Sequence, residues 1–206
     1  MNDWDETNVK FAIALVIFAV LYVAGHLLIA RAWADNQISI DQIGSYNTVA
    51  ITQDGTAQSA TVVLGKDSAA DNNYIAITQQ GTGNKTSKVE ILGGINNGVA
   101  INQDGAGNHY AGIQNLLGTA NNVSVNQTGA GNHTLAIAGA TGSTNSGNSI
   151  TAEQSGGVGA DKTFQLNLNG TNGATVNVQQ TNPITPNSGS MSIQCITCGT
   201  YNYIRQ

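Results

Sequence analysis

The sequence predicts an all-β fold, in which strand-turn-strand repeats stack as a β-solenoid of about six to seven rungs. A ten-residue segment that begins at Val99 returns 24 residues later at Val123. Related segments begin at Val49, Ile75, Ile150 and Val176. Apolar and polar residues alternate within each copy, as in a strand with one buried face. The chain has 25 Gly, two Pro and only 9% charged residues, a composition that favours stacked strands over a helical core.

The hydrophobic segment at the start of the chain, residues 1–34, is expected to be a secretory signal peptide or an uncleaved signal anchor. A nearly uninterrupted apolar run extends from Phe11 to Ala30. Two overlapping A-x-A sequences between Ala30 and Ala34 match what signal peptidase cleaves. The run is also long enough to span a bilayer as a helix, which keeps the anchor open. In both cases the rest of the chain would be secreted or displayed at the cell surface.

Residues 35–182 are expected to form the solenoid itself, as twelve short strands in six units of about 24 residues. Each strand directs side chains inward at positions i, i+2 and i+4, and the stronger strands place two aliphatic residues and then Gln there. One two-stranded unit is at best marginally stable in water. The units must therefore share a core, and parallel in-register stacking about 4.8 Å apart provides one. Residues 183–206 are expected to form a loop and a short final rung.

Amide side chains are expected to stack in ladders that fix the register. Gln has the same parity as the buried Ile and Val, and each amide can donate to one neighbour and accept from the other. A slip of one residue would leave buried amides unpaired, at about 1–3 kcal/mol each, and turn the apolar set outward. The predicted ladder positions are Gln42, Gln53, Gln79, Gln103, Gln127, Gln154 and Gln180, with Asn47, Asn84, Asn108 and Asn132 at the turns. The alternative is that these residues are ordinary turn and surface polar residues.

Glycines in the turns are expected to supply backbone conformations that are closed to other residues. These positions are Gly44, Gly55, Gly81, Gly105 and Gly129.

The two cysteines, Cys195 and Cys198, stand in a C-x-x-C spacing near the end of the chain. Three interpretations are open: a local disulfide in an oxidising compartment, a crosslink between subunits, and a metal or redox site. The local disulfide is favoured, because no second cysteine pair or nearby His completes a zinc site.

No set of residues in the sequence indicates catalysis, so no enzyme activity, cofactor or metal is expected. There is no Ser/His/Asp or Cys/His arrangement and no phosphate-binding Gly loop before a helix. His109 and His133 occupy equivalent repeat positions that stacking would bring together. We expect exposed turn histidines there, with a metal site as the alternative. A net charge of −5 without a basic patch argues against nucleic-acid binding.

The repeat unit Ile-x-Gln-x-Gly-x-x-Asn-x-x-Ala/Val-x-Ile resembles the curlin repeat of bacterial curli fibre subunits and their nucleators. The segments that carry the resemblance begin at Gln42, Gln79, Gln103 and Gln127. It covers about residues 38–180. Three insertions, near 66–73, 140–148 and 155–163, and the slightly longer period depart from the family pattern. The C-x-x-C instead looks like that of the related Fap-type fibre proteins.

The resemblance implies a secreted protein that assembles end to end into extracellular cross-β fibres of a biofilm matrix or cell coat. It also implies as partners other copies of the chain, a nucleator or major fibre subunit, and an outer-membrane export channel. A second hypothesis is a capped, monomeric or membrane-anchored β-solenoid that acts as a surface adhesin or binding module. Uncapped ends would favour the fibre, since soluble repeat proteins usually carry capping units.

Overall fold

The computed structural model describes residues 35–65, 70–92, 95–114, 119–139, 145–181 and 184–206. The predicted signal segment, residues 1–34, lies outside the described residues, as do residues 66–69 and 140–144 within two of the expected insertions. The described residues form fourteen strands and no helix, which confirms the predicted all-β solenoid. They also contain no helix long and apolar enough to cross a membrane.

The first twelve strands lie at or within a few residues of the positions that the alternating pattern predicts, and the last two strands form the expected final rung. The bounds of the fourteen strands are β1 Gln37–Asp41, β2 Thr48–Gly55, β3 Gln58–Val63, β4 Tyr74–Gly81, β5 Lys85–Glu90, β6 Gly98–Asp104, β7 His109–Gln114, β8 Asn122–Gly129, β9 His133–Gly139, β10 Ser149–Gly156, β11 Lys162–Leu168, β12 Thr175–Gln180, β13 Asn187–Ile193 and β14 Thr200–Arg205.

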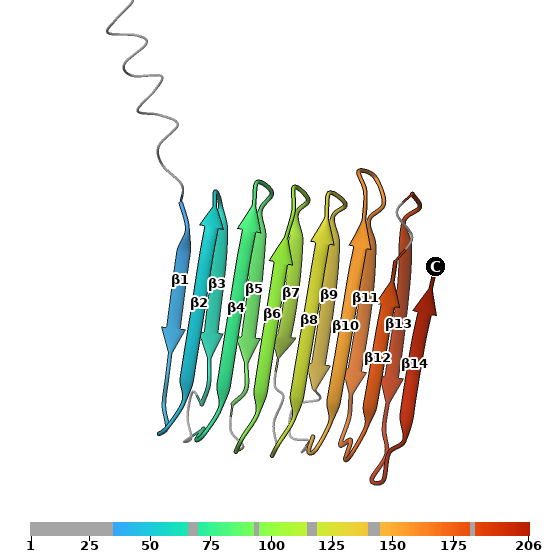
Figure 1. Cartoon of the computed structure of the whole chain (residues 1–206). Coiled ribbons are helices and arrows are strands. Elements are labelled where there is room, and N and C mark those ends of the chain that lie inside the picture. Colours follow the sequence, from blue (N-terminus) through green and yellow to red (C-terminus); the bar gives the residue numbers. More distant parts are fainter. Residues whose placement is uncertain (1–34, 66–69, 93–94, 115–118, 140–144, 182–183) are drawn as a thin grey trace, which may run out of the picture. The chain divides into compact units, whose positions relative to one another are not determined.

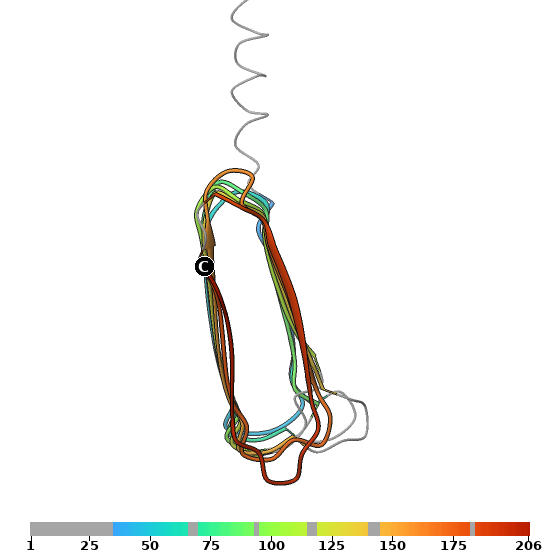
Figure 2. The ribbon, with the colours of Figure 1, turned by 90° about the vertical axis from the view of Figure 1, so that its right-hand side faces the viewer.

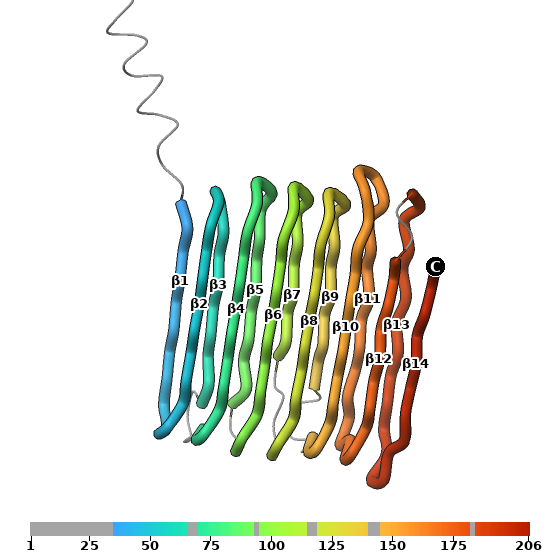
Figure 3. Tube along the Cα trace, viewed as in Figure 1, coloured from blue at the N-terminus to red at the C-terminus, as the bar shows by residue number. Residues whose placement is uncertain are grey.

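The strands form two seven-stranded sheets, in which every pairing is parallel. One sheet has the order β1-β3-β5-β7-β9-β11-β13, and the other has β2-β4-β6-β8-β10-β12-β14 (Figure 1). Each odd strand and the even strand that follows it make one rung. Viewed along the stack, successive rungs overlie one another as a flattened ring (Figure 2), and the tube trace shows the regular advance from rung to rung (Figure 3).

The core lies between the two sheets and consists of aliphatic columns. Ile75 in β4, for example, pairs with Val49 in β2 and with Val99 in β6. The register therefore places like side chains on one another through the whole stack, and the inward residues of the middle rungs are fully buried. The expected insertion at residues 155–163 is a longer connection between β10 and β11, with Val158 exposed at its tip.

Each rung reverses direction twice, and the two turns differ. The Asn turn leads from an odd strand to the next even strand and ends in an Asn, at Asn47, Asn73, Asn97, Asn121 and Asn148. The Gly turn leads from an even strand to the next odd strand and begins with a Gly, at Gly55, Gly81, Gly105, Gly129 and Gly156. Columns of polar side chains line the interior beside both turns.

Candidate functional site: the stacked columns and the open ends

The inward glutamines of the even strands form a continuous ladder through the first four rungs. Gln53 Nε2 donates to Gln79 Oε1 at 2.8 Å, Gln79 Nε2 to Gln103 Oε1 at 3.0 Å, and Gln103 Nε2 to Gln127 Oε1 at 2.9 Å. Gln79, Gln103 and Gln127 have no exposed surface. Each amide thus bridges two rungs, and a register slip would break both bonds at once.

The same glutamines also tie the two sheets together. Gln79 Nε2 donates to the carbonyl of Ser59 at 2.9 Å, and Gln103 Nε2 to that of Thr86 at 3.1 Å. Gln53 and Gln127 make the same bond to Gln37 and Tyr110 of their own rungs. One side chain therefore fixes both the spacing between rungs and the closure of its own rung.

The ladder reverses direction at its far end. Gln180 Nε2 donates to Gln154 Oε1 at 2.7 Å, opposite to the direction in the earlier rungs. Gln154 Nε2 and Gln180 Oε1 are buried without hydrogen-bond partners. The reversal follows the longest repeat interval, 27 residues from Gln127 to Gln154 against 24 from Gln103 to Gln127.

One predicted member of this ladder was placed wrongly. Gln42 follows β1 in the odd sheet and is exposed, whereas the other predicted glutamines belong to even strands. The prediction failed because both kinds of strand carry the same apolar-apolar-Gln series in the first rung, although their position in the rung differs.

A second amide ladder, at the Asn turn, was missed in the sequence apart from Asn47. The Oδ1 atom of Asn73 accepts hydrogen bonds from both the backbone N–H and the Nδ2 atom of Asn97, at 3.1 and 2.9 Å. The same pair of bonds links Asn47 to Asn73, Asn97 to Asn121, and Asn121 to Asn148. Asn73, Asn97, Asn121 and Asn148 are at most 2% exposed. Their donors point toward the N-terminal rung, opposite to those of the glutamines.

The other three predicted asparagines form a separate, exposed column at the Gly turn. Asn108 Oδ1 accepts from the backbone N–H of Asn84 at 2.9 Å, and Asn132 Oδ1 accepts from that of Asn108 at 3.2 Å. Asn47 therefore does not stack with Asn84, Asn108 and Asn132, because it belongs to the opposite turn. Their shared Gly-x-x-Asn motif hid this difference.

Four of the predicted turn glycines stack at the Gly turn with no space between them. Gly81, Gly105 and Gly129 have φ of 95°, 119° and 105°, values that L side chains rarely adopt. A Cβ built on Gly105 would lie 2.2 Å from the carbonyl oxygen of Gly129. Gly55 continues this column, whereas Gly44 lies in the first Asn turn, against the backbone of Ala70.

A column of charged and polar side chains lies inside the Gly turn, at the first position of the odd strands. It consists of Gln58, Lys85, His109, His133, Lys162 and Asn187, each paired directly with the next. The four ionisable members are at most 1% exposed. The expectation of exposed turn histidines was therefore wrong. His109 and His133 share the parity of the inward series and are enclosed by the turn.

The histidine pair is stacked inside the column. The two imidazole rings are stacked with centroids 4.9 Å apart and an interplanar angle of 22°. Their neighbours in the column are lysines, and the described residues contain no group of three or more His, Cys, Asp or Glu that could hold a metal ion. A 340 Å³ surface depression lies along Asn84, Asn108, Asn132 and Tyr110 beside the column.

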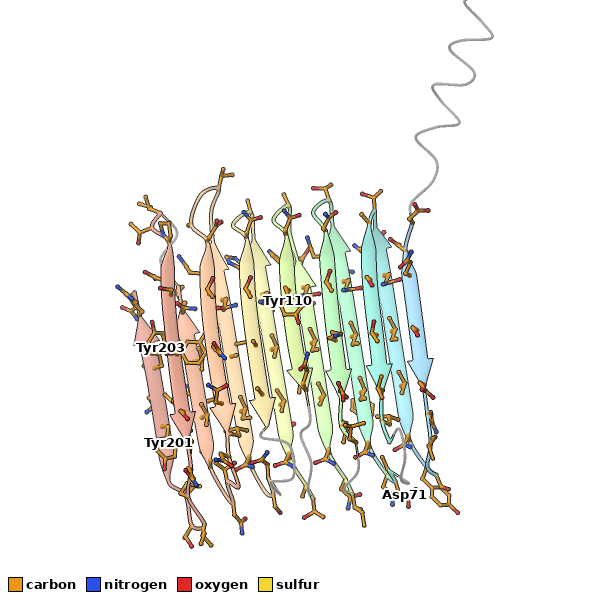
Figure 4. The ribbon with its side chains drawn as sticks, turned by 180° about the vertical axis from the view of Figure 1, so that it is seen from behind. Asp71, Tyr110, Tyr201 and Tyr203 are labelled. Carbon is orange, nitrogen blue, oxygen red and sulfur yellow. A yellow bond between two sulfur atoms is a disulfide. The ribbon has the colours of Figure 1, made fainter. Side chains whose placement is uncertain are left out.

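The two end rungs expose apolar side chains and open sheet edges. In the first rung, Ile38 and Ile40 are 52% and 48% exposed. In the last rung, Tyr201 and Tyr203 of β14 lie over the core (Figure 4), and the Tyr203 ring packs 4.8 Å from that of Phe164. Cys195 and Cys198 are joined by a disulfide in the connection between β13 and β14.

The chain matches no family profile, and comparison with curated proteins and with solved structures finds no significant match. The structure itself thus defines a class, a parallel β-solenoid with stacked amide ladders and terminal rungs that no described segment covers.

Proposed function

We propose that this chain is a subunit of an extracellular fibre, in which copies stack end to end with the rung register continued across each junction. The observation that carries the proposal is the pair of open ends. β1 and β2 at one end, and β13 and β14 at the other, have unpaired outer edges within the described residues. Such edges present free N–H and C=O groups that a second copy can extend.

The apolar columns support continuation across a junction. Following the observed pairings, Ile40 of one copy would lie on Met191 of the next, and Val49 on Tyr201. Stacking would bury the side chains that each end now exposes, and burial of apolar surface stabilises by roughly 25 cal/mol per Å². The repetitive fold and the curlin-like repeat fit the same role.

The rest of the proposal follows from the resemblance to curlin repeats. The chain would be secreted, with residues 1–34 as its signal peptide or anchor, and would act as a subunit or nucleator in a biofilm matrix or cell coat. Its partners would be further copies, a nucleator or major subunit, and an outer-membrane export channel.

A surface adhesin that stays monomeric is the second candidate, and one observation favours it. The carbonyl of Ser188 accepts hydrogen bonds from Tyr203 Oη and Arg205 Nη1, both at 3.1 Å. Because Asn187 N–H bonds back to Asp161, alternation in a parallel ladder directs Ser188 to the open edge of β13. Both lone pairs of this edge carbonyl are thus occupied, so it cannot accept a hydrogen bond from a second copy and acts as a partial cap.

Cysteine crosslinking distinguishes the two functions. Ser39 and Ser190 face outward in one column, so a junction in register would place them about 4.8 Å apart, within disulfide range. We expect a mixture of the single variants S39C and S190C to form an intermolecular disulfide under oxidation, seen on non-reducing gels.

The matched control replaces S190C by S192C, which lies two residues along the same strand and out of disulfide range. Equal crosslinking of both mixtures would reject the register. A stable monomer without crosslinks, and without a 4.7–4.8 Å meridional fibre reflection, would reject the fibre and leave the adhesin.

A further inference from the structure

The column Lys85–His109–His133–Lys162 places four ionisable side chains one above another in the interior of the solenoid. Their strands pair directly in the order β5, β7, β9 and β11, so neighbouring members are about 4.8 Å apart. Two ammonium groups therefore enclose a stacked pair of imidazoles. Buried cations at this spacing repel one another strongly, because the interior screens charge far less than water does.

Backbone carbonyls accept hydrogen bonds from both lysines, three from Lys85 and one from Lys162. Lys85 Nζ donates to the carbonyls of Gly107 at 2.6 Å, Gly105 at 2.9 Å and Gly83 at 3.3 Å. Lys162 Nζ donates to the carbonyl of Thr185 at 2.5 Å. The close-packed Gly turns thus supply carbonyl groups to Lys85, and the connection between β12 and β13 supplies one to Lys162.

The imidazoles lack comparable acceptors. His133 Nε2 lies 3.0 Å from the carbonyl of Thr128, which can only accept, so this nitrogen carries the proton. His133 Nδ1 and both ring nitrogens of His109 are buried and make no well-aligned hydrogen bond, although the carbonyls of Gly129 and Gly131 act weakly on His109. A second proton on either ring would therefore add a buried cation beside a lysine, with poorer acceptors than the three that Lys85 has.

We propose that this column couples folding of the third to sixth rungs to neutral imidazoles, so that mildly acidic solution shifts the folding equilibrium toward the unfolded chain. The switch acts on folding of the single chain and does not depend on the proposed assembly. At neutral pH, His in the unfolded chain is mostly neutral, and enclosing it in the column requires no loss of a proton.

The charged groups around the column set the direction of the effect. Burial, followed by the charge of Lys85 and the neighbouring His133, lowers the pKa of His109 to about 3, against a weaker opposing effect of the Gly129 and Gly131 carbonyls. The pKa of His133 is also lowered by burial and by Lys162, while the Thr128 carbonyl and Asp161 oppose this.

The pKa values of Lys85 and Lys162 are likewise lowered by burial, opposed by Asp104 and Asp161. Each of these pKa shifts favours the neutral form of its side chain in the folded state. Between about pH 3 and 6.5 the unfolded chain therefore binds more protons than the folded chain at His109, and stability falls as the pH falls through this window.

For His109 alone, moving from pH 7.5 to pH 5 should shift the folding equilibrium about 30-fold toward the unfolded chain, and His133 should add to this. The test dilutes the full chain from denaturant at pH 7.5, 6 and 5 and follows β-structure by far-ultraviolet circular dichroism. The variant H109Q/H133Q keeps an inward amide of the kind found at Gln58 but cannot titrate. It should lose at least this 30-fold dependence.

The matched control, T86Q/T134Q, changes outward residues of β5 and β9, the two strands on either side of β7 in the same sheet, and should keep the wild-type pH dependence. Equal pH dependence of wild type and H109Q/H133Q would overturn the proposal. Should that variant fail to fold, ¹⁵N-imidazole chemical shifts of the folded wild type decide the matter. Neutral rings at pH 5 support the switch, and protonated rings in an intact solenoid overturn it.

Discussion

Polar groups stack closely at both turns of each rung, but the two turns use different residue types to achieve this. The Asn turn uses one residue type whose side chain both donates and accepts, so every copy satisfies its neighbour. The Gly turn encloses Lys and His. Ammonium groups cannot pair with one another, and the rings of His109 and His133 are stacked rather than hydrogen-bonded to each other. A self-complementary side chain can be repeated indefinitely, whereas a column of titratable side chains depends on the pH.

The backbones of the two turns differ in the same sense. The Asn turn passes through the left-handed region with φ near 60°, which Asn72, Asn96 and Ala120 all adopt. The Gly turn needs φ of 95–145° at Gly55, Gly81, Gly105 and Gly129. The first conformation is uncommon but open to residues with a Cβ, and the second is essentially closed to them. Substitutions in the two turns should therefore have very different effects.

The largest effect is expected from Gly105→Ala in the Gly turn. The new Cβ would meet the Gly129 backbone at 2.2 Å in addition to the strain at φ 119°. We expect a loss of about 3 kcal/mol or more in the free energy of unfolding, measured by urea titration of the full chain. The control Gly199→Ala, where nothing lies within 4 Å of the new Cβ, should change it by less than about 0.5 kcal/mol. Similar losses in both would show that packing at the Gly turn is not limiting.

At the Asn turn, the most damaging change should be Asn97→Leu. It keeps the size of the side chain but removes the acceptor for Asn121 N–H and Nδ2 and the donor to Asn73 Oδ1. A buried backbone N–H left without its acceptor gives an expected loss of about 2–4 kcal/mol in the same urea titration.

The matched control for this change is Asn102→Leu. Asn102 also stacks on an equivalent asparagine, with Nδ2 2.9 Å from Asn126 Oδ1, but on the outer face of the sheet. Water can replace that bond, so the loss should stay below about 0.5 kcal/mol. Equal losses at the two positions would mean that burial does not increase the contribution of the ladder hydrogen bonds to the free energy of unfolding.

The strands and the Gln ladder could be predicted from the sequence, because both follow from the alternation of inward and outward residues along each strand. Asn73 and Asn97 carried the same signal, since each stands two residues before the first inward aliphatic residue of its even strand. That signal was missed because Asn is common in any turn. Lys85 and His109 also have inward parity, but a charged residue in a core position contradicts the usual distribution. The carbonyl groups of the Gly turns, which the sequence does not locate, explain the burial of Lys85.

The smallest effect should be a gain at the Asn turn, from Ala120→Gly. Ala120 holds φ 58° on an exposed turn, and the equivalent positions in the next two rungs are Gly147 and Gly173. Relief of left-handed strain, about 1–2 kcal/mol, is partly offset by the greater freedom of Gly in the unfolded chain, about 0.4–1 kcal/mol. We expect a net gain of roughly 0.5 kcal/mol in the urea titration. A gain as large as the loss expected for Gly105→Ala would show that the left-handed position is as restrictive as the Gly turn, and the contrast between the two turns would then lie in their side chains alone.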